Sequence, residues 1–349
     1  MNKPGTNLAD FLAEQQAEKS LATLLIEVAD ICAEIAALTA KGALAKITGK
    51  LNSQNIQGET QTQLDVISND LCIDGLSKCD LVAGLASEEV DDVCNIRAGK
   101  YLVMFDPLDG SSNVAINVTV GTIFSVLNAP EGRMPIEADY LQSGSQQVAA
   151  GYALYGPATM LVFTIGKGTH GFTLDSETQT FVLTHPNMRV AETTSEFAIN
   201  ASNERFWEPP IERYINECKA GEEGVRGRDF NMRWVASMVA EVHRILLRGG
   251  VYLYPRDSKK PLKAGRLRLM YELNPMSMLV EQAGGQSSTG EMRVMDIVPE
   301  QVHQRAPVII GTAQEVSLVE RYTQAFVSGD VQKGFSPLFG ERSLFHKKQ

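Results

Sequence analysis

The feature that most constrains this chain is a short apolar run that ends abruptly at an aspartate. Residues 101–105 have the length of a buried strand and are too short for a typical helix. Because ligands in open α/β sheets bind beyond the carboxyl ends of the strands, Asp106 and Asp109 are placed for chemistry. We expect Pro107 to end the strand, since proline cannot donate a hydrogen bond to a neighbouring strand. The plainer alternative is a strand followed by an Asp-Gly turn.

Small residues follow these two acids directly. Gly110, Ser111 and Ser112 offer hydroxyls and unobstructed backbone N–H groups, which is what a phosphate needs from a turn or a helix start. The sequence thus places acids suited to a metal beside amides suited to a phosphate.

The length of the chain favours two domains. Its 349 residues exceed the size at which a single core usually divides, and 44% hydrophobic with 21% charged residues is an ordinary globular balance. Polar residues at 185–187 and 191–196 interrupt the apolar pattern. We therefore expect an N-terminal domain over residues 1–195, a C-terminal domain over 196–340 and a tail at 341–349. The fold class expected from composition and patterning is α/β.

The charge balance argues against several kinds of partner. The chain has 32 Lys and Arg against 42 Asp and Glu, a net charge of −10, so general binding to nucleic acid or to a membrane surface is not expected. Residues 1–18 lack the basic start and apolar core of a signal peptide, and no apolar run could span a bilayer, which predicts a cytoplasmic protein. The five cysteines show no paired zinc spacing, and we expect them to be reduced and mostly buried.

Apolar periodicity predicts a sheet-rich first half with two packing helices. Helical spacing covers residues 21–38, with Ser20 as the N-cap, and residues 64–76. Between them, the polar residues 42–61 are expected to form a mobile loop of the kind that acts as a lid. Strand patterns follow at 80–86, 101–105, 119–127 and 147–166, with a hairpin at 171–183.

The second half alternates strands and helices. A strand over residues 197–200 ends in the amide of Asn200, and a strong amphipathic helix is expected to start just after Arg233. Alternation over residues 265–272 would place Arg266, Arg268 and Glu272 on one face of a strand. The other expected elements are helices at 204–219 and 276–283, a strand at 249–255 and a final strand and helix within 294–326.

Acidic residues recur where predicted strands and helices begin or end. If they cluster, they repel one another strongly, and bound divalent cations would relieve that repulsion. With oxygen ligands only and no His or Cys in the set, Mg²⁺ or Mn²⁺ fits better than zinc. For any single acid the alternative is a solvated surface carboxylate. The set consists of Glu59, Asp65, Glu88, Glu89, Asp106, Asp109 and Glu272.

Blocks of sequence spread over nearly the whole chain carry a family resemblance. They lie at residues 64–70, 87–89, 105–113, 148–156, 249–255, 271–275 and 303–307. In this order they closely resemble class I fructose-1,6-bisphosphatase. The Asp-Pro-Leu-Asp-Gly-Ser-Ser motif is typical of the magnesium-dependent sugar and inositol phosphatases, and the other blocks indicate the fructose-bisphosphatase branch. The resemblance implies a layered α/β/α/β/α fold with two domains and a homotetramer.

The resemblance also implies roles for individual residues. Two or three Mg²⁺ ions per subunit, with Mn²⁺ as an alternative, would be held by Glu88, Glu89, Asp106, Asp109, Glu272 and the carbonyl of Leu108. Asp65, Glu59 and Glu89 would serve catalysis, the first two by activating the attacking water. Arg233 would reach the substrate from a neighbouring subunit. The substrate-binding set would be Asp109, Gly110, Ser111, Ser112, Asn200, Arg233, Trp234, Tyr254, Arg266 and Arg268.

The implied reaction is hydrolysis of the 1-phosphate of fructose 1,6-bisphosphate, in gluconeogenesis or in the Calvin cycle. Arg266 stands where the family has Lys, and Trp234 stands where it usually has Tyr. Sedoheptulose-1,7-bisphosphatase activity, alone or in addition, is therefore an alternative. A non-catalytic carbohydrate- or nucleotide-binding regulator is disfavoured, because every expected metal-ligand acid is present.

Inhibition by AMP is expected to be weak or absent. Many family members bind AMP at a Gly-Thr-Gly-Glu-Leu-Thr turn that opens the first long helix, where small residues leave N–H groups free for phosphate. The aligned residues 17–22 contain neither glycine nor threonine, and Glu18 adds a negative charge. Lys100 and Tyr101 remain from the family's other AMP contacts.

Overall fold

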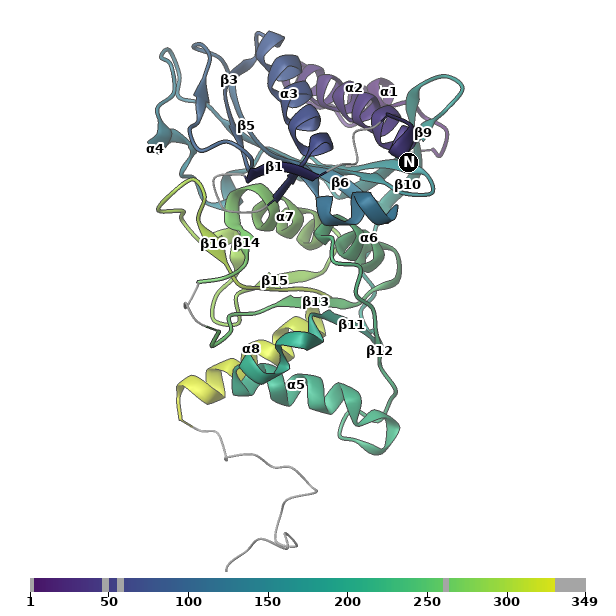
Figure 1. The fold of residues 1–349 in the computed structure, drawn as a ribbon, viewed down its shortest axis with the longest axis vertical. Helices are drawn as coiled ribbons and strands as arrows, with labels where there is room; N and C mark the ends of the chain where they lie inside the picture. The colour runs from purple at the N-terminus through teal and green to yellow at the C-terminus, as the bar shows by residue number, and fades with distance from the viewer. Residues whose placement is uncertain (1–2, 46–49, 55–59, 260–263, 330–349) are drawn as a thin grey trace, which may run out of the picture.

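The computed structural model describes residues 3–45, 50–54, 60–259 and 264–329. Five layers of secondary structure alternate along the long axis of the molecule: helices, a large sheet, helices, a smaller sheet and helices (Figure 1). The predicted α/β/α/β/α arrangement is confirmed. Each sheet is thus covered by helices on both faces, which explains why most of its strands are buried throughout.

The first helical layer contains α1 (Leu8–Glu14), α2 (Lys19–Lys41) and α3 (Gln63–Lys78). The apolar face of α2 packs on α3 and on the large sheet, as the helical spacing predicted. Ser20 is not the N-cap of α2, because the helix begins at Lys19 and Glu18 is its N-cap. The hydroxyl of Ser20 instead lies 2.8 Å from the hydroxyl of Tyr101.

The large sheet has eight strands in the order β10-β9-β8-β7-β6-β5-β3-β4. Its one parallel pair is β3 with β5, so the carboxyl ends of these two strands meet at the same edge. The predicted hairpin around residues 175–176 is confirmed as β9 with β10. The strands are β3 (Val82–Ser87), β4 (Cys94–Asn95), β5 (Tyr101–Asp109), β6 (Val120–Asn128), β7 (Ala149–Tyr155), β8 (Thr159–Thr164), β9 (Thr169–Asp175) and β10 (Thr180–Met188).

Strand β5 is longer than the sequence predicted. It continues through Pro107 to Asp109 and pairs with β6 up to Gly121. The expectation that Pro107 ends the strand is wrong, because the register shifts between Asp106 and Asp109, and an irregularity in the ladder accommodates a residue without an N–H. The carbonyl of Pro107 still accepts a hydrogen bond from the hydroxyl of Thr122 at 2.9 Å.

The middle layer consists of α6 (Met238–Arg248) and α7 (Asn274–Gln282), which pack between the two sheets. The smaller sheet has the order β12-β11-β13-β17-β15, and α5 (Pro209–Lys219) and α8 (Ala313–Val327) cover its outer face. Its strands are β11 (Glu196–Ile199), β12 (Asn231–Met232), β13 (Val251–Tyr254), β15 (Gln286–Ser288) and β17 (Val308–Gly311).

Three predicted elements differ from the structure. The loop expected over residues 42–61 contains a two-stranded ribbon, β1 (Lys50–Gln54) with β2 (Thr60–Thr62). The strand expected over residues 265–272 is only β14 (Leu267–Arg268), after which the chain enters a π-helical segment, Leu269–Leu273, that continues into α7. Helix α6 begins at Met238, not just after Arg233. Local alternation and helical spacing could not resolve these boundaries, since tertiary contacts set them.

The remaining elements are a small two-stranded sheet and several short helices. Strand β16 (Arg305–Ala306) pairs with β14 in an antiparallel two-stranded sheet. Within the ranges that the structure describes, no helix is long and apolar enough to cross a membrane. The short helical elements are η1 (Gly42–Ala45), η2 (Ser111–Ile116), α4 (Glu137–Tyr140), η3 (Gly144–Gln146), η4 (Ala201–Phe206), η5 (Gly221–Glu223) and η7 (Val294–Asp296).

Candidate active site

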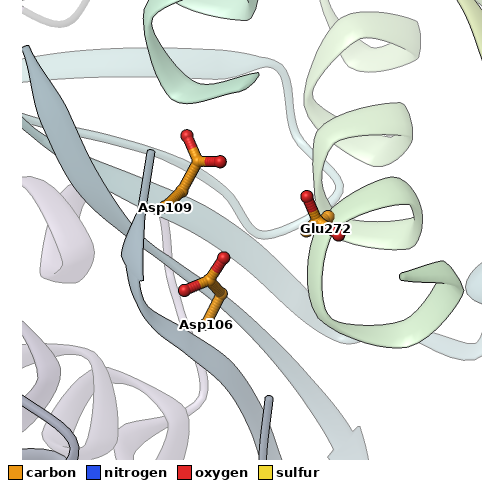
Figure 2. Close-up of side chains that lie close together, drawn as sticks. All are labelled: Asp106, Asp109 and Glu272. Atoms are coloured by element: carbon orange, nitrogen blue, oxygen red, sulfur yellow. The ribbon is translucent and has the colours of Figure 1, made fainter. Parts of the chain in front are cut away.

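Three carboxylates meet between the large sheet and the middle helices. Asp106 and Asp109 lie at the end of β5, and Glu272 lies in the π-helical segment before α7 (Figure 2). One oxygen of each lies within 4.8 Å of the others. All three residues are buried, with at most 8% of their surface exposed. The predicted clustering of these acids is therefore present, although Glu272 reaches it from a helix and not from the strand that alternation predicted.

Hydrogen bonds fix Asp109 to the start of helix α6. Its Oδ2 accepts a hydrogen bond from the Ser237 hydroxyl at 2.7 Å and another from the Val239 N–H at 2.8 Å. The positive end of a helix dipole favours a carboxylate at this position. Ser237 was missed from the sequence, although a serine before the apolar spacing of α6 is an N-cap signal.

Acids from β3 approach the same centre. Glu88 follows β3, donates its N–H to the Phe105 carbonyl at 3.0 Å, and its side chain is paired with the buried Arg268 guanidinium. Glu272 accepts a hydrogen bond from the backbone N–H of Arg268. Leu108 is buried between Asp106 and Asp109, and its N–H donates to Asp106 Oδ1 at 2.9 Å. The parallel pairing of β3 and β5 thus delivers acids from both strands to one edge.

The electrostatics of this cluster disfavour negative charge. Burial raises the pKa of Asp106 well above its usual range, and repulsion from Glu88, Asp109, Glu272 and Glu89 raises it further. Burial also raises the pKa of Asp109, against the hydrogen bonds from Val239 and Ser237. Carboxylates packed this closely retain their charges when a cation lies among them. The donor atoms are all oxygen, which suits a hard divalent cation.

Asp65 lies beside this cluster at the start of α3. It forms a capping box with Thr62, whose N–H donates to Asp65 Oδ2 at 2.5 Å. Asp65 is 1% exposed, and its Oδ1 has no hydrogen-bond partner among the described residues. Burial, together with repulsion from Glu89, raises the pKa of Asp65 to about 6. Glu59, the other predicted base, lies outside the described residues.

The turn after β5 is tight and leads directly into a short helix. Gly110 adopts the left-handed conformation with φ 76°, and a Cβ there would lie 2.7 Å from the Cβ of Ser237. Only glycine meets both conditions without strain. A short 3-10 helix, Ser111–Ile116, starts directly after it. Ser111 lies close enough to Asp65 to oppose the rise of its pKa, so this turn lies near Asp65.

Aromatic residues pack together at β13 of the smaller sheet and in the loop after β12. The ring of Trp234 stacks on Tyr252 with centroids 5.9 Å apart and lies 6.0 Å from the ring of Tyr254. Arg266 forms an ion pair with the buried Asp257 at 3.1 Å. Its charge lowers the pKa of Tyr254, while burial is the larger effect and raises it. Trp234 and Tyr254 are therefore neighbours, and Arg266 lies close enough to Tyr254 to affect its pKa.

Asn200 and Arg233 are less closely held. The Asn200 side chain caps the short helix η4, where its Oδ1 accepts hydrogen bonds from the N–H and hydroxyl of Ser202 at 3.2 and 2.6 Å. The side chain of Arg233 is 49% exposed, and its Nε lies 3.6 Å from a carboxylate oxygen of Glu196. The contacts described for Arg233 within its own chain do not include the carboxylate cluster.

Comparisons with known proteins agree with this geometry. Family profiles named fructose-1-6-bisphosphatase N-terminal and C-terminal domain match residues 6–186 and 190–324. A class 1 fructose-1,6-bisphosphatase from Methylacidiphilum infernorum is 51% identical over 348 residues, and another from Methylibium petroleiphilum is 51% identical over 350 residues, each covering 97% of both chains. The crystal structure of Leishmania major fructose-1,6-bisphosphatase in holo form superposes with a TM-score of 0.86 at 34% identity, covering 93% of this chain and 100% of that one.

The layered fold, with a carboxylate cluster beside a glycine-serine turn, defines an enzyme of the phosphoric monoester hydrolase class. The full-length matches narrow that class. The chain belongs to the class 1 fructose-1,6-bisphosphatase family.

Proposed function

We propose that this protein hydrolyses the 1-phosphate of fructose 1,6-bisphosphate, which gives fructose 6-phosphate and phosphate. The observation that carries the proposal is the buried set Asp106, Asp109 and Glu272, which lies directly beside the Gly110 turn. The sugar bisphosphate is inferred from relatives that are 51% identical over 97% of the chain and are named class 1 fructose-1,6-bisphosphatase. The product would enter gluconeogenesis or the Calvin cycle.

Divalent metal binding is the second part of the proposal. Two or three Mg²⁺, or Mn²⁺ in their place, would be held by oxygens of Glu88, Glu89, Asp106, Asp109, Glu272 and the Leu108 carbonyl. The mutual repulsion that raises the pKa of Asp106 supports this set. When bound, such ions lower the pKa of a water and stabilise charge on the phosphoryl and leaving oxygens.

The protein's own groups would then carry the proton and orient the phosphate. Asp65 has a free oxygen in the described part of the chain and a pKa of about 6, so near neutral pH it is ionised and can accept a proton from the attacking water. Glu89 and Glu59 would assist it. The N–H groups and hydroxyls of Gly110, Ser111 and Ser112, with the Arg268 guanidinium, would hold the phosphate that leaves.

The phosphate that is not hydrolysed, called the distal phosphate below, would be bound by residues at the smaller sheet. Asn200, Trp234, Tyr254 and Arg266 extend along the ends of β11 and β13 and the loops beside them. The exposure of Arg233 supports the inference that it binds a substrate on a neighbouring subunit of a homotetramer. Arg266, which stands where the family has Lys, forms an ion pair with Asp257. Because this residue of the proposed substrate site differs from the family, sedoheptulose 1,7-bisphosphate is a second candidate substrate.

We also infer that AMP has little effect on this enzyme. Glu18, the N-cap of α2, forms an ion pair with Lys100, and the hydroxyls of Ser20 and Tyr101 lie 2.8 Å apart. The polar groups at this helix start are thus bonded to one another. A phosphate there would have to displace Glu18 and meet its negative charge.

Phosphate release from each sugar bisphosphate tests the proposed reaction. With saturating Mg²⁺, we expect kcat/KM to be higher for fructose 1,6-bisphosphate than for sedoheptulose 1,7-bisphosphate. Higher kcat/KM for the seven-carbon sugar would favour the second candidate. Release from neither substrate would refute both.

A further inference from the structure

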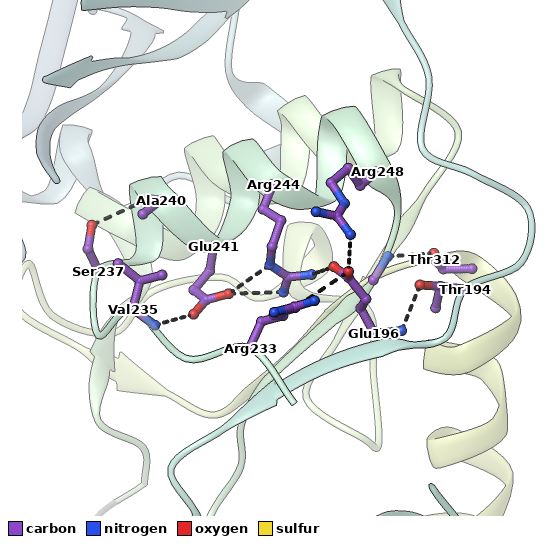
Figure 3. A network of polar contacts seen from close by, with 11 residues as sticks. Thr194, Glu196, Arg233, Val235, Ser237, Ala240, Glu241, Arg244, Arg248 and Thr312 are labelled. Atoms are coloured by element: carbon purple, nitrogen blue, oxygen red, sulfur yellow. Dashed lines mark hydrogen bonds and ion pairs between the residues drawn. The ribbon is translucent and has the colours of Figure 1, made fainter. Parts of the chain in front are cut away.

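A network of charged residues lies behind the loop that joins β12 to α6. Glu196 and Glu241 alternate with three arginines in this network (Figure 3). The Arg244 guanidinium bridges the two acids, with 2.9 Å to Glu196 Oε2 and 2.9 Å to Glu241 Oε2. Arg248 also pairs with Glu196, and Arg233 lies 3.6 Å from it. None of these residues belongs to the carboxylate cluster.

Glu241 holds the loop through its backbone. Its side chain is fully buried, and its Oε1 accepts the Val235 N–H at 2.7 Å. The Val235 carbonyl in turn accepts a hydrogen bond from Asn113 at 3.0 Å. The loop backbone is therefore fixed on one side by the network and on the other by the short helix that follows the Gly110 turn.

The loop is held in a conformation that its sequence does not favour. Ala236, between Val235 and Ser237, has φ 60°, a left-handed value that residues with a Cβ rarely adopt. Such a conformation persists only where the surrounding contacts impose it. The hydrogen bond from Val235 to Glu241 and the bond from Ser237 to Asp109 lie on either side of Ala236.

The two ends of this loop serve different parts of the proposed site. Ser237 donates to Asp109 at 2.7 Å, and the ring of Trp234 lies 6.0 Å from the ring of Tyr254. A shift at Ala236 would therefore move a partner of a metal-binding carboxylate and a substrate-binding ring together. Groups that orient metal ligands typically change metal affinity when they are removed.

We propose that Glu241 and Arg244 are positioning residues: they hold residues 233–237 in the strained turn that presents Ser237 to Asp109 and Trp234 to the substrate. This inference rests on the proposed function for its kinetic consequence. Its consequence for metal binding follows from the contact between Ser237 and Asp109 and does not require a substrate.

The test compares two buried glutamates of similar surroundings. Glu315 lies in the first turn of α8, has a side chain that is 2% exposed, and pairs with Arg226 and Arg228. Helix α8 covers the outer face of the smaller sheet, whereas the carboxylate cluster lies on the other side of that sheet, between the large sheet and the middle helices (Figure 1). Glu315→Ala is thus the matched control for Glu241→Ala, since each removes a buried carboxylate that is paired with arginine.

Mn²⁺ binding to the full-length protein, followed by electron paramagnetic resonance of the free ion, is the first readout. We expect Glu241→Ala to weaken Mn²⁺ affinity about tenfold or more, whereas Glu315→Ala leaves it unchanged. In phosphate release, Glu241→Ala should both raise KM and lower kcat. Glu241→Gln keeps an acceptor for the Val235 N–H, so it should recover part of each loss. Equal Mn²⁺ affinity and kinetics in Glu241→Ala and Glu315→Ala would overturn the proposal.

Where Glu241→Ala does not fold, Glu241→Gln is measured alone, and we expect Mn²⁺ affinity several-fold below that of the unaltered protein, because Arg244 loses one of its two carboxylate partners. Unchanged affinity in Glu241→Gln would then refute the positioning role. Where the unaltered protein releases no phosphate from fructose 1,6-bisphosphate, the proposed function fails, and the Mn²⁺ comparison still decides the inference.

Discussion

The carboxylate side of the site and the side proposed to bind the distal phosphate are built differently. Asp106, Asp109 and Glu272 are at most 8% exposed, and the described hydrogen bonds to them come from backbone N–H groups and from Ser237. Arg233, in contrast, has a side chain that is 49% exposed, and its Nε lies 3.6 Å from a carboxylate oxygen of Glu196. A buried and hydrogen-bonded cluster can be complete within one chain, whereas an exposed arginine can reach beyond it.

This contrast predicts a separation of kinetic effects. Changes on the carboxylate side should lower the maximal rate, because they remove groups that interact with the transition state. Changes on the distal side should mainly raise the half-saturation concentration, since they remove binding remote from the bond that breaks.

Asp109→Asn should have the largest effect. The change keeps the shape of the side chain but removes a buried negative charge from the proposed metal site, so kcat should fall about 10³-fold or more. The folded protein should retain its melting temperature, because the loss of the Asp109 charge relieves its repulsion with Asp106. Rate measurements and thermal melting check both statements. Unfolding of this variant would show that Asp109 is needed for the fold, and the kinetic contrast between the two sides of the site would then lose its support.

Asp65→Asn should lower kcat about 10²-fold, on the scale of lost general base catalysis. Asparagine can still cap α3 by accepting the Thr62 N–H, so the helix should persist. In the unaltered protein, kcat should rise with pH through about 6, because only ionised Asp65 accepts a proton. That limb should be missing in Asp65→Asn. An unchanged pH profile in this variant would assign the limb to another group.

The raised pKa of Asp65 also affects stability without metal. A carboxyl whose folded pKa lies above its unfolded value stabilises the fold below the unfolded value, and this contribution is lost as pH rises through the folded value. Unfolding by denaturant in chelator should therefore show stability decreasing from about pH 4 to about pH 6, in part through Asp65. Asp65→Asn should flatten this dependence. A variant with the same slope as the parent would show that Asp65 does not contribute.

Arg233→Ala should raise KM about tenfold, the scale of one lost hydrogen bond to a charged group, and change kcat little. Arg213 provides a control, since it is 56% exposed and forms an ion pair with Glu217 at 3.0 Å on the outer helix α5. Arg213→Ala should leave both constants unchanged. If kcat falls in Arg233→Ala while KM does not change, the division between the two sides of the site is wrong.

The smallest expected effect is that of AMP on the initial rate. Because Glu18 and Lys100 are paired at the start of α2, AMP titrated at saturating Mg²⁺ should leave the rate nearly unchanged. Cooperative inhibition at micromolar AMP would show that other contacts replace the missing turn. Ser20→Ala serves as a control, because it removes the remaining hydroxyl at this helix start.

The sequence predicted the carboxylate side better than the distal side, for a physical reason. The acids and glycine of residues 106–112 are local in sequence, and one buried strand brings them to one edge of the sheet. The extension of β5 past Pro107 and the π-helical turn at Glu272 depend on pairing with β6 and on packing into α7, which local patterns do not contain. Ser237 was missed because its role depends on a contact with Asp109, which lies far from it in sequence.

Other expectations stay predictions. The division of the chain near residue 195, the roles of the individual site residues and the homotetramer rest on the resemblance and on the geometry described above. Glu59 lies outside the described residues, and its part in activating water rests on the resemblance alone. The proposed roles of Asn200 and Arg233 involve a bound sugar and, for Arg233, a neighbouring subunit, and hydrophobic periodicity carries no signal for either.

The central claim is that this buried acid cluster works only with a divalent cation among its charges. The most direct measurement is phosphate release from fructose 1,6-bisphosphate by protein stripped with a chelator, before and after graded addition of Mg²⁺. We predict no release above background in chelator and full recovery with Mg²⁺, because the repulsion among Asp106, Asp109 and Glu272 then has a counter-charge. Full activity of the stripped protein in excess chelator would contradict the account.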